Sequence, residues 1–159
     1  RIPVPGNRGL SAADRRARAD AIFRPYHRAI DETIAAKRSG GVTPAIVSLH
    51  SFTPRMNGFA RPWHVGVLWN RDPRLPVPVM ARLLKEPGIV VGDNEPYSGR
   101  DEHGYSMPKH AEAEGLPHAL FEVRQDRIAD EAGVTEWADR LTRVLRDVLA
   151  DERVYRPHG

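Results

Sequence analysis

The sequence contains no cysteine among its 159 residues. A disulfide framework and a metal site built on thiolates are therefore excluded. This absence is typical of proteins from a reducing compartment, and we predict a cytoplasmic location. No apolar run approaches the ~18 residues that a membrane-spanning helix needs, and no hydrophobic segment near the first residue has the form of a secretory signal. We therefore expect no interaction with membranes.

The motifs of several enzyme classes are also missing. The sequence has no HExxH pair, no glycine-rich phosphate loop and no GxSxG segment. Its 24 basic and 21 acidic residues leave a net charge of only +3, and the arginines are scattered, so no nucleic-acid partner is expected. Hydrophobic residues make up 40% of the chain, which is ordinary for a globular domain with a core.

The pattern of apolar residues predicts helices alternating with strands. A long helix is expected to start at an N-cap Ser11, to kink or split in two at Pro25 and to end at Gly40-Gly41. A last amphipathic helix is expected from an N-cap Thr135, followed by a loosely held tail from Asp151. Short apolar runs predict strands at 45–50, 64–69, 89–91 and 118–123. Two further segments, 78–85 and 106–115, are predicted to be helices. Such alternation predicts a layered α/β fold.

The segment VSLHSFTP places His50 where the first predicted strand ends. In open α/β sheets, ligand sites gather outside the carboxyl ends of strands, so His50 is a candidate to bind a ligand or a metal. The alternative is a histidine that is simply satisfied at the edge of the core.

Glu122 is the more unusual residue, because it lies in the apolar strand HALFEV. A glutamate is almost never fully buried unless it is paired. One interpretation is a buried ion pair with Arg124 or another arginine, and Arg124 has the same strand parity and so projects to the same face. The other is a general base whose pKa is tuned by its surroundings.

The segment from Gly92 to Tyr105 is a long polar loop. Loops of this length inside compact domains tend to be functional or disordered. Asn94, Tyr97 and Ser98 offer donors and acceptors to a small polar ligand, and the alternative is a solvated loop rich in turns.

Four segments together resemble the N-formylglutamate amidohydrolase family, which is in turn similar to zinc carboxypeptidases. They are SLHSFTP, ARPWHVGVLWNRDPRL, VVGDNEPYSG and LPHALFEVRQD. The resemblance extends over essentially the whole chain and implies a mixed β-sheet flanked by helices. It also implies that His50, in the HS pair, is a zinc ligand and that Glu122, in FEVR, is the catalytic glutamate.

The activity that this resemblance implies is the zinc-dependent hydrolysis of an N-acyl amino acid such as N-formylglutamate. Glu122 would take a proton from a water molecule, and Arg71 or Arg124 could hold a substrate carboxylate. Asn94, Tyr97 and Ser98 would contact the same small-molecule substrate.

The resemblance also has consequences for the extent of the domain. Family members begin well before the segment IPVPGNRGLS and carry further metal ligands there. We therefore expect residues 1–159 to form a single amidohydrolase-like domain that is incomplete at its N-terminus, lacks sheet strands and exposes a sheet edge. The alternative is a non-catalytic fragment or a small-ligand-binding module without a complete metal site.

Overall fold

The computed structural model describes residues 4–101 and 104–158. The chain divides into two compact units, Arg1–Val42 and Thr43–Gly159, and each is described by itself. Glu102 and His103 of the predicted polar loop lie outside the described residues. Among the residues that are described, no helix has both the length and the apolar character needed to cross a membrane.

The first unit is the predicted long helix. After a short turn, η1 (Pro5–Asn7), it comprises α1 (Ala12–Arg18), the π-helical turn η2 (Ala19–Phe23) and α2 (Arg24–Ser39). Ser11 is the N-cap as predicted, because its Oγ accepts a hydrogen bond from the Asp14 amide at 3.1 Å. The π-helical turn lies just ahead of Pro25, where a ring without an amide hydrogen cannot continue the usual bonding. Gly40 is the C-cap.

The second unit is built on a four-stranded mixed sheet of order β1-β6-β4-β5. Strand β1 pairs parallel with β6, β6 antiparallel with β4, and β4 parallel with β5. The elements are β1 (Ile46–Phe52), β2 (Arg55–Met56), β3 (Phe59–Ala60), β4 (Val65–Leu68), α3 (Pro76–Leu83), β5 (Val91–Asp93), η3 (Pro108–Glu112), β6 (His118–Arg124), η4 (Gln125–Arg127), α4 (Glu131–Leu149) and η5 (Glu152–Tyr155). The expected α/β fold with a mixed sheet and flanking helices is confirmed.

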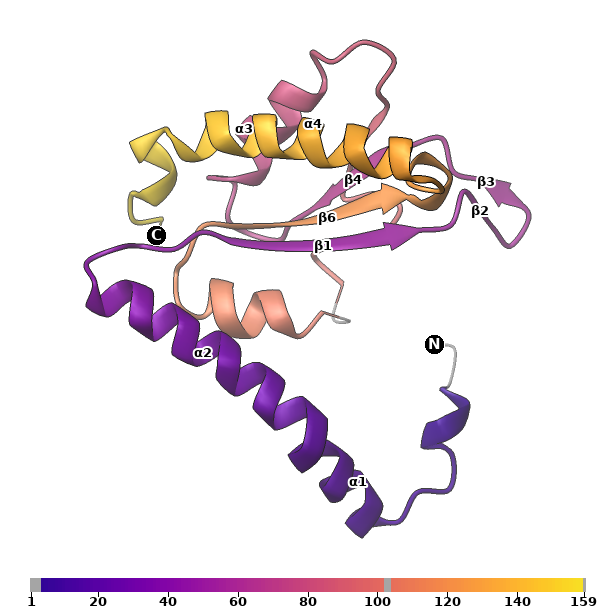
Figure 1. Cartoon of the computed structure of the whole chain (residues 1–159), viewed down its shortest axis with the longest axis vertical. Helices are drawn as coiled ribbons and strands as arrows, with labels where there is room; N and C mark the ends of the chain where they lie inside the picture. The colour runs from indigo at the N-terminus through magenta and orange to yellow at the C-terminus, as the bar shows by residue number, and fades with distance from the viewer. Residues whose placement is uncertain (1–3, 102–103, 159) are drawn as a thin grey trace. The chain divides into compact units, whose positions relative to one another are not determined.

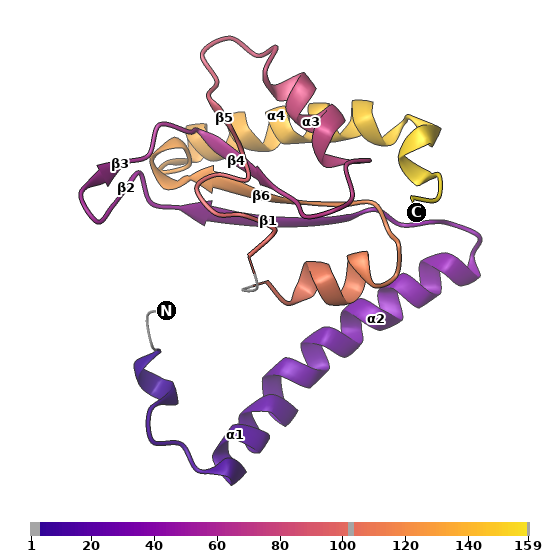
Figure 2. The ribbon, with the colours of Figure 1, turned by 180° about the vertical axis from the view of Figure 1, so that it is seen from behind.

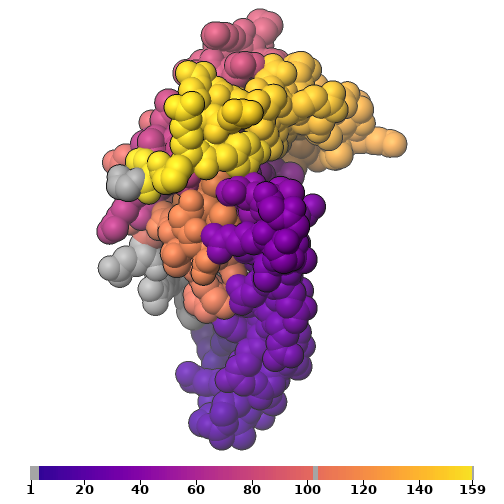
Figure 3. Space-filling view, turned by 90° about the vertical axis from the view of Figure 1, so that its left-hand side faces the viewer, coloured from indigo at the N-terminus to yellow at the C-terminus, as the bar shows by residue number. Residues whose placement is uncertain are grey.

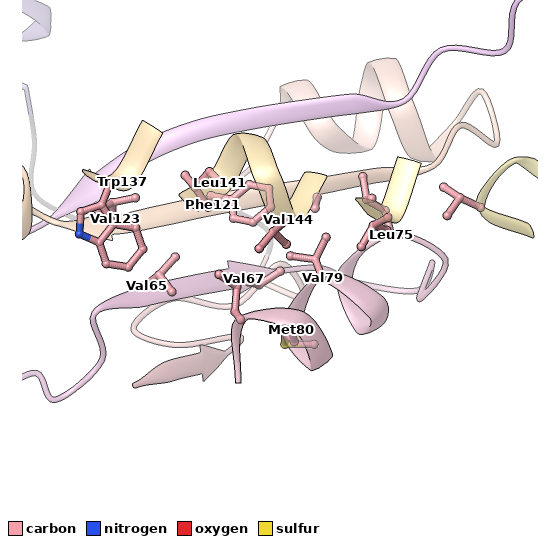
Figure 4. Packing of buried hydrophobic residues seen from close by; sticks show 14 residues of the cluster. Val65, Val67, Leu75, Val79, Met80, Phe121, Val123, Trp137, Leu141 and Val144 are labelled. Atoms are coloured by element: carbon pink, nitrogen blue, oxygen red, sulfur yellow. The ribbon is translucent and has the colours of Figure 1, made fainter. Parts of the chain in front are cut away.

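One face of this sheet carries the hydrophobic core. Helices α3 and α4 lie on the same side of the sheet in both views of the ribbon (Figure 1 and Figure 2). Phe121 and Val123 of β6 point toward Trp137, Leu141 and Val144 of α4 (Figure 4). Val65 and Val67 of β4 belong to the same cluster. Successive side chains of a strand point to opposite faces, so Glu122, between Phe121 and Val123, projects from the face away from this core.

Three local differences from the sequence-based expectations have physical reasons. The segment 51–62, expected to be a loop because of its two prolines and its glycine, contains the hairpin β2–β3. The turn residues Asn57 and Gly58 both have positive φ, a requirement that Asn-Gly pairs meet well. Helix α4 begins earlier than predicted, because Asp130 rather than Thr135 caps it by accepting from the Gly133 amide at 2.8 Å.

The C-terminal segment was also predicted wrongly as a loosely held tail. Residues Glu152–Tyr155 form the helical turn η5, in which Val154 is only 3% exposed and joins the core. The Tyr155 hydroxyl donates to the Leu149 carbonyl at 3.2 Å, which ties this turn to α4. Figure 3 shows these C-terminal residues in yellow.

Candidate active site

His50 and Glu122 lie side by side on neighbouring strands. They are register partners in the parallel pair of β1 and β6, so their side chains leave the same face of the sheet about 5 Å apart. That face is the one opposite α3 and α4. The fold therefore brings together the two residues that the sequence singled out most strongly.

Glu122 is buried and incompletely satisfied. The residue is only 8% exposed, and its Oε2 has no hydrogen-bond partner among the described residues. Burial raises the pKa of this carboxyl above its ordinary value, and the nearby charges of His50 and Arg61 partly oppose the rise. A buried carboxylate with a free oxygen and a raised pKa has the properties of a proton acceptor.

Arg124 is engaged elsewhere than at Glu122. Its guanidinium forms an ion pair with Asp126, with Nε and Oδ1 2.7 Å apart, and donates to the Arg61 carbonyl at 2.9 Å. It also donates to the Pro62 carbonyl at 3.2 Å. These bonds fix the segment that connects β3 to β4. The buried ion pair between Glu122 and Arg124, considered above as an alternative, is therefore not among the ion pairs of the described residues.

The polar loop after β5 lies on the same face of the sheet as Glu122. Gly66 is the register partner of both Glu122 and Gly92, so all three positions face the same side. A Cβ added at Gly66 would lie 1.9 Å from the Glu95 carbonyl oxygen, and one at Gly92 would lie 2.8 Å from that atom. Only glycine leaves space for this approach. The loop backbone is thus seated on the sheet next to Glu122.

Asn94 holds the loop in this place. Its Oδ1 accepts hydrogen bonds from the Trp69 amide at 3.0 Å and the Gly99 amide at 2.9 Å. Ser98 has a local contact, since its Oγ accepts from the Arg100 amide at 3.1 Å. Both side chains therefore make contacts that shape the loop. Tyr97 is different, because its hydroxyl is within 3.2 Å of Arg61 Nη1, on the side of the loop that meets the β3–β4 connection.

Arg61 is the residue of this site that the sequence analysis did not single out. It is only 7% exposed, it stacks over the rings of Phe52 and Tyr97, and its charge acts on Glu122. It lies within the segment ARPWHVGVLWNRDPRL that carries the family resemblance. The signal that could have revealed it is the Asn57–Gly58 pair, which predicts a hairpin and thereby a fixed place for the arginine that follows it.

Arg71 lies at the other end of the sheet from this cluster. Strand β4 runs antiparallel to β6, and its last residue, Leu68, pairs with Leu120. The residues after Leu68 therefore continue toward the start of β6 at His118, away from Glu122. Arg71 lines a cavity of about 320 Å³ there, together with Asp72, Arg74, Glu112, Gly115 and His158. The structure does not bring Arg71 together with Glu122.

The described residues provide one candidate metal ligand at the site. His50 Nε2 is 2.9 Å from Ser48 Oγ, and when Nε2 donates to that hydroxyl, Nδ1 carries the free lone pair. A catalytic zinc ion needs three protein ligands. No group of three or more histidine, cysteine, aspartate or glutamate side chains able to hold a metal occurs among the residues described. His50 therefore fits a zinc site as one ligand and does not complete it.

An imidazole beside an unpaired carboxylate lies here near the carboxyl ends of two parallel strands, where ligand sites of open α/β sheets gather, and the carboxylate can act as a general base. The model of the N-formylglutamate amidohydrolase family matches residues 3–129. Because this match covers most of the sequence, the chain belongs to the N-formylglutamate amidohydrolase family. A comparison with curated proteins gave no match.

Two solved structures share this fold. The crystal structure of a gene product from Agrobacterium tumefaciens is 32% identical, with a TM-score of 0.87, and the match covers 94% of this chain and 59% of that one. N-formylglutamate amidohydrolase from Ralstonia eutropha is 22% identical, with a TM-score of 0.66, and the match covers 92% and 59%. At that identity the second likeness is evidence for the fold alone. The chain spans about three-fifths of the length of each neighbour.

Proposed function

We propose that this chain belongs to an enzyme that hydrolyses the amide bond of an N-acyl amino acid such as N-formylglutamate, with Glu122 as the general base. The observation that carries the proposal is the buried Glu122 carboxylate, unpaired at Oε2 and in register with His50. The family match supports the choice of substrate.

The reaction needs a group that first accepts a proton and later returns it. The Glu122 carboxylate takes one proton from the attacking water as the water oxygen bonds to the amide carbon. The carbon–nitrogen bond then breaks, and Glu122 gives the proton to the departing nitrogen, which becomes the free amine of the amino acid. The acyl group leaves as a carboxylic acid, formic acid for a formyl substrate. A pKa raised by burial makes Glu122 a better acceptor near neutral pH than an exposed glutamate.

We further propose that the enzyme depends on zinc and that His50 is one of its ligands. When held in part by His50, a zinc ion would supply Lewis-acid chemistry, which lowers the pKa of bound water and polarises a carbonyl group. The residues described supply only this one ligand, so the remaining ligands would come from outside them. Ser48 supports His50 by fixing the ring through its hydroxyl.

The remaining substrate contacts in the proposal come from the loop after β5. Tyr97 is the candidate for direct contact, and Asn94 and Ser98 act by shaping the loop. Arg124 positions the β3–β4 connection, and the proposal gives Arg71 no part in substrate binding, because of its place in the fold. A cytoplasmic location stays a prediction from the lack of cysteine.

The proposal is tested by measuring formate release from N-formylglutamate by the complete enzyme and its Glu122→Gln variant. The amide is nearly isosteric but cannot accept the proton, so turnover is expected to fall about 10²–10⁴-fold. Glu136→Gln, an exposed position on α4, is the matched control and should leave turnover unchanged. Unchanged turnover in Glu122→Gln would remove Glu122 from the role of general base, and no formate release by the wild-type enzyme would favour a non-catalytic module that binds a small ligand.

A further inference from the structure

Arg61 is a buried cation with only neutral partners. Nη1 lies 3.3 Å from both the carbonyl and the hydroxyl oxygen of Thr53 and 3.2 Å from the Tyr97 hydroxyl, and Nη2 lies 2.9 Å from Met56 Sδ. Sulfur is a weak acceptor. Among the described residues, Nε has no acceptor and the guanidinium forms no ion pair with a carboxylate.

The other shielded arginines of the same unit are paired. Arg74, Arg124 and Arg140 have side chains that are 10–12% exposed, and each forms an ion pair, with Asp72, Asp126 and Glu86 respectively. Burying a charge is costly unless a partner compensates it. Arg61 is thus an exception within its own fold, and an exception of this kind is expected where a ligand supplies the missing negative charge.

Glu122 does not take the place of that partner. Its charge interacts with Arg61 over a distance, but the two groups form no ion pair. In the proposed reaction Glu122 also becomes neutral each time it accepts a proton, so it cannot balance the guanidinium throughout a turnover. The Arg61 guanidinium therefore still lacks an anionic partner that stays charged while the amide is cleaved.

The place of Arg61 on the sheet matches the geometry of such a substrate. Its guanidinium stacks over the ring of Phe52, with 5.7 Å to the ring centre, and Phe52 lies two residues beyond His50 on β1. Two residues along a strand span about 7 Å. The carboxylates of an N-acyl amino acid lie only a few bonds from the amide carbon, which is a comparable distance.

We propose that Arg61 binds a carboxylate of the substrate through Nε and Nη2, and that Tyr97 and Thr53 hold its guanidinium in place. Arginine matches the two oxygens of a carboxylate with two parallel donors, which a lysine cannot do. This inference rests on the proposed function, since it names the group that selects amino acids carrying a free carboxylate. It assigns to Arg61 the recognition of a substrate carboxylate, a role that neither Arg71 nor Arg124 fills.

The first test compares three substrates: N-formylglutamate and its two monoamides, in which either the α- or the side-chain carboxylate is replaced by an uncharged amide. The complete wild-type enzyme should prefer N-formylglutamate over at least one monoamide by about 10²-fold in kcat/KM, because a charge pair at a buried site is lost. In Arg61→Gln this preference should disappear. Arg61→Lys should restore only part of it, since it keeps the charge and loses the fork.

Two results would overturn the proposal. One is a preference between acid and monoamide that persists in a folded Arg61→Gln enzyme. The other is an equal loss of kcat/KM for all three substrates, which would assign Arg61 to the amide being cleaved. Arg82→Gln on α3, an exposed arginine paired with Asp147, is the control for loss of a surface charge and should keep the wild-type preference.

A binding experiment separates this inference from the proposed function. Calorimetry with N-formylglutamate and its monoamides is carried out in the Glu122→Gln background, with Arg61 intact or changed to Lys. Selective binding of the acid that requires Arg61 supports the inference, even where the wild-type enzyme releases no formate. Acid and monoamides that bind equally well with Arg61 intact would refute it, whatever the catalytic role of Glu122.

Discussion

Gly66 and Glu122 face each other across the antiparallel pair of β4 and β6, and the space that a side chain at Gly66 would fill holds the Glu95 carbonyl. The loop after β5 is thereby seated against the position next to the proposed base. One glycine in the middle of the sheet thus links the place of the loop to the surroundings of the carboxylate.

Gly66→Ala is therefore expected to damage the protein and the site together. The new methyl group would lie 1.9 Å from the Glu95 oxygen, so the loop has to shift. Overpacking of this kind typically costs about 1–3 kcal/mol. Thermal denaturation should show a lower Tm, and kcat/KM should fall with it. Gly104→Ala, whose added Cβ would meet no atom nearer than 3.8 Å, is the control, and equal Tm values for the two variants would contradict the prediction.

Glu122→Gln should stabilise the fold at neutral pH while it removes activity. Burial raises the folded-state pKa of Glu122 above its ordinary value of 4.5. Its neutral form therefore favours folding below pH 4.5, and that contribution is lost as the pH rises through the folded-state pKa. The glutamine carries no charge at any pH, so its Tm should exceed that of the wild type at pH 7. The difference should shrink toward pH 4, and a Tm at pH 7 below that of the wild type would count against the burial argument.

Zinc affinity should depend on Ser48 as well as on His50. His50→Ala removes a proposed ligand, and the complete enzyme should then lose bound zinc together with activity. Ser48→Ala removes the hydroxyl that orients the ring, which typically costs 10–100-fold in metal affinity. Ser39→Ala, where the hydroxyl only contacts the Ala36 carbonyl, is a suitable control. Metal analysis after dialysis against a chelator measures the effect, and normal zinc content in His50→Ala would return His50 to the role of a residue at the edge of the core.

The 159-residue chain by itself is expected to bind zinc weakly and to be nearly inactive. The described residues offer one imidazole at the site, and zinc affinity depends on assembling several ligands. Titration of the isolated chain with zinc, followed by calorimetry, measures this affinity. Tight binding of one zinc ion per chain would contradict the prediction, because it would show that the chain itself provides more zinc ligands than His50.

His64 should make the fold less stable in mild acid. Burial and then the positive charges of Arg127 and Arg124 lower its pKa below 6.5. Because the folded-state pKa of His64 is lowered, the contribution of neutral His64 to the free energy of unfolding is complete above pH 6.5. It is lost as the pH falls through the folded-state pKa. Urea unfolding between pH 5 and 8 should show this decline, and His64→Gln should make it shallower. The exposed His158→Gln should leave the slope as it is, and an identical slope in His64→Gln would exclude His64 as the cause.

Apart from the hairpin β2–β3, the sequence was sufficient for the order of the main strands and helices and for placing Glu122 on the face away from its apolar neighbours. Glu122 stands between Phe121 and Val123, and strand parity alone separates the carboxylate from the apolar pair. Register could not be predicted in the same way, because it depends on which strands become neighbours. The pairing of His50 with Glu122 is therefore a result of tertiary structure.

One feature that was missed depends on contacts between segments far apart in the sequence, and another depends on local packing at the start of a helix. Arg61 looks like an ordinary loop arginine until the hairpin and the loop after β5 bury it against Tyr97. The last helix was predicted to start at an N-cap Thr135, beyond Gly133. In the structure Gly133 lies inside the first turn of α4, and its added Cβ would lie 2.4 Å from the Arg127 carbonyl, so the glycine is needed there for close packing.

The seating of the loop on Gly66 and Gly92 has a consequence for protein engineering. The tightest contact at Gly66 is with the Glu95 carbonyl oxygen, and those at Gly92 are with the same oxygen and with the Glu95 Cβ, atoms that any residue except glycine provides. Outward-pointing positions of the loop can then be randomised to change the accepted acyl group or amino acid, while the surroundings of the carboxylate stay constant. Libraries that keep Gly66, Gly92 and Asn94 fixed and vary their exposed neighbours should retain a folded scaffold at a higher rate than libraries that vary the glycines.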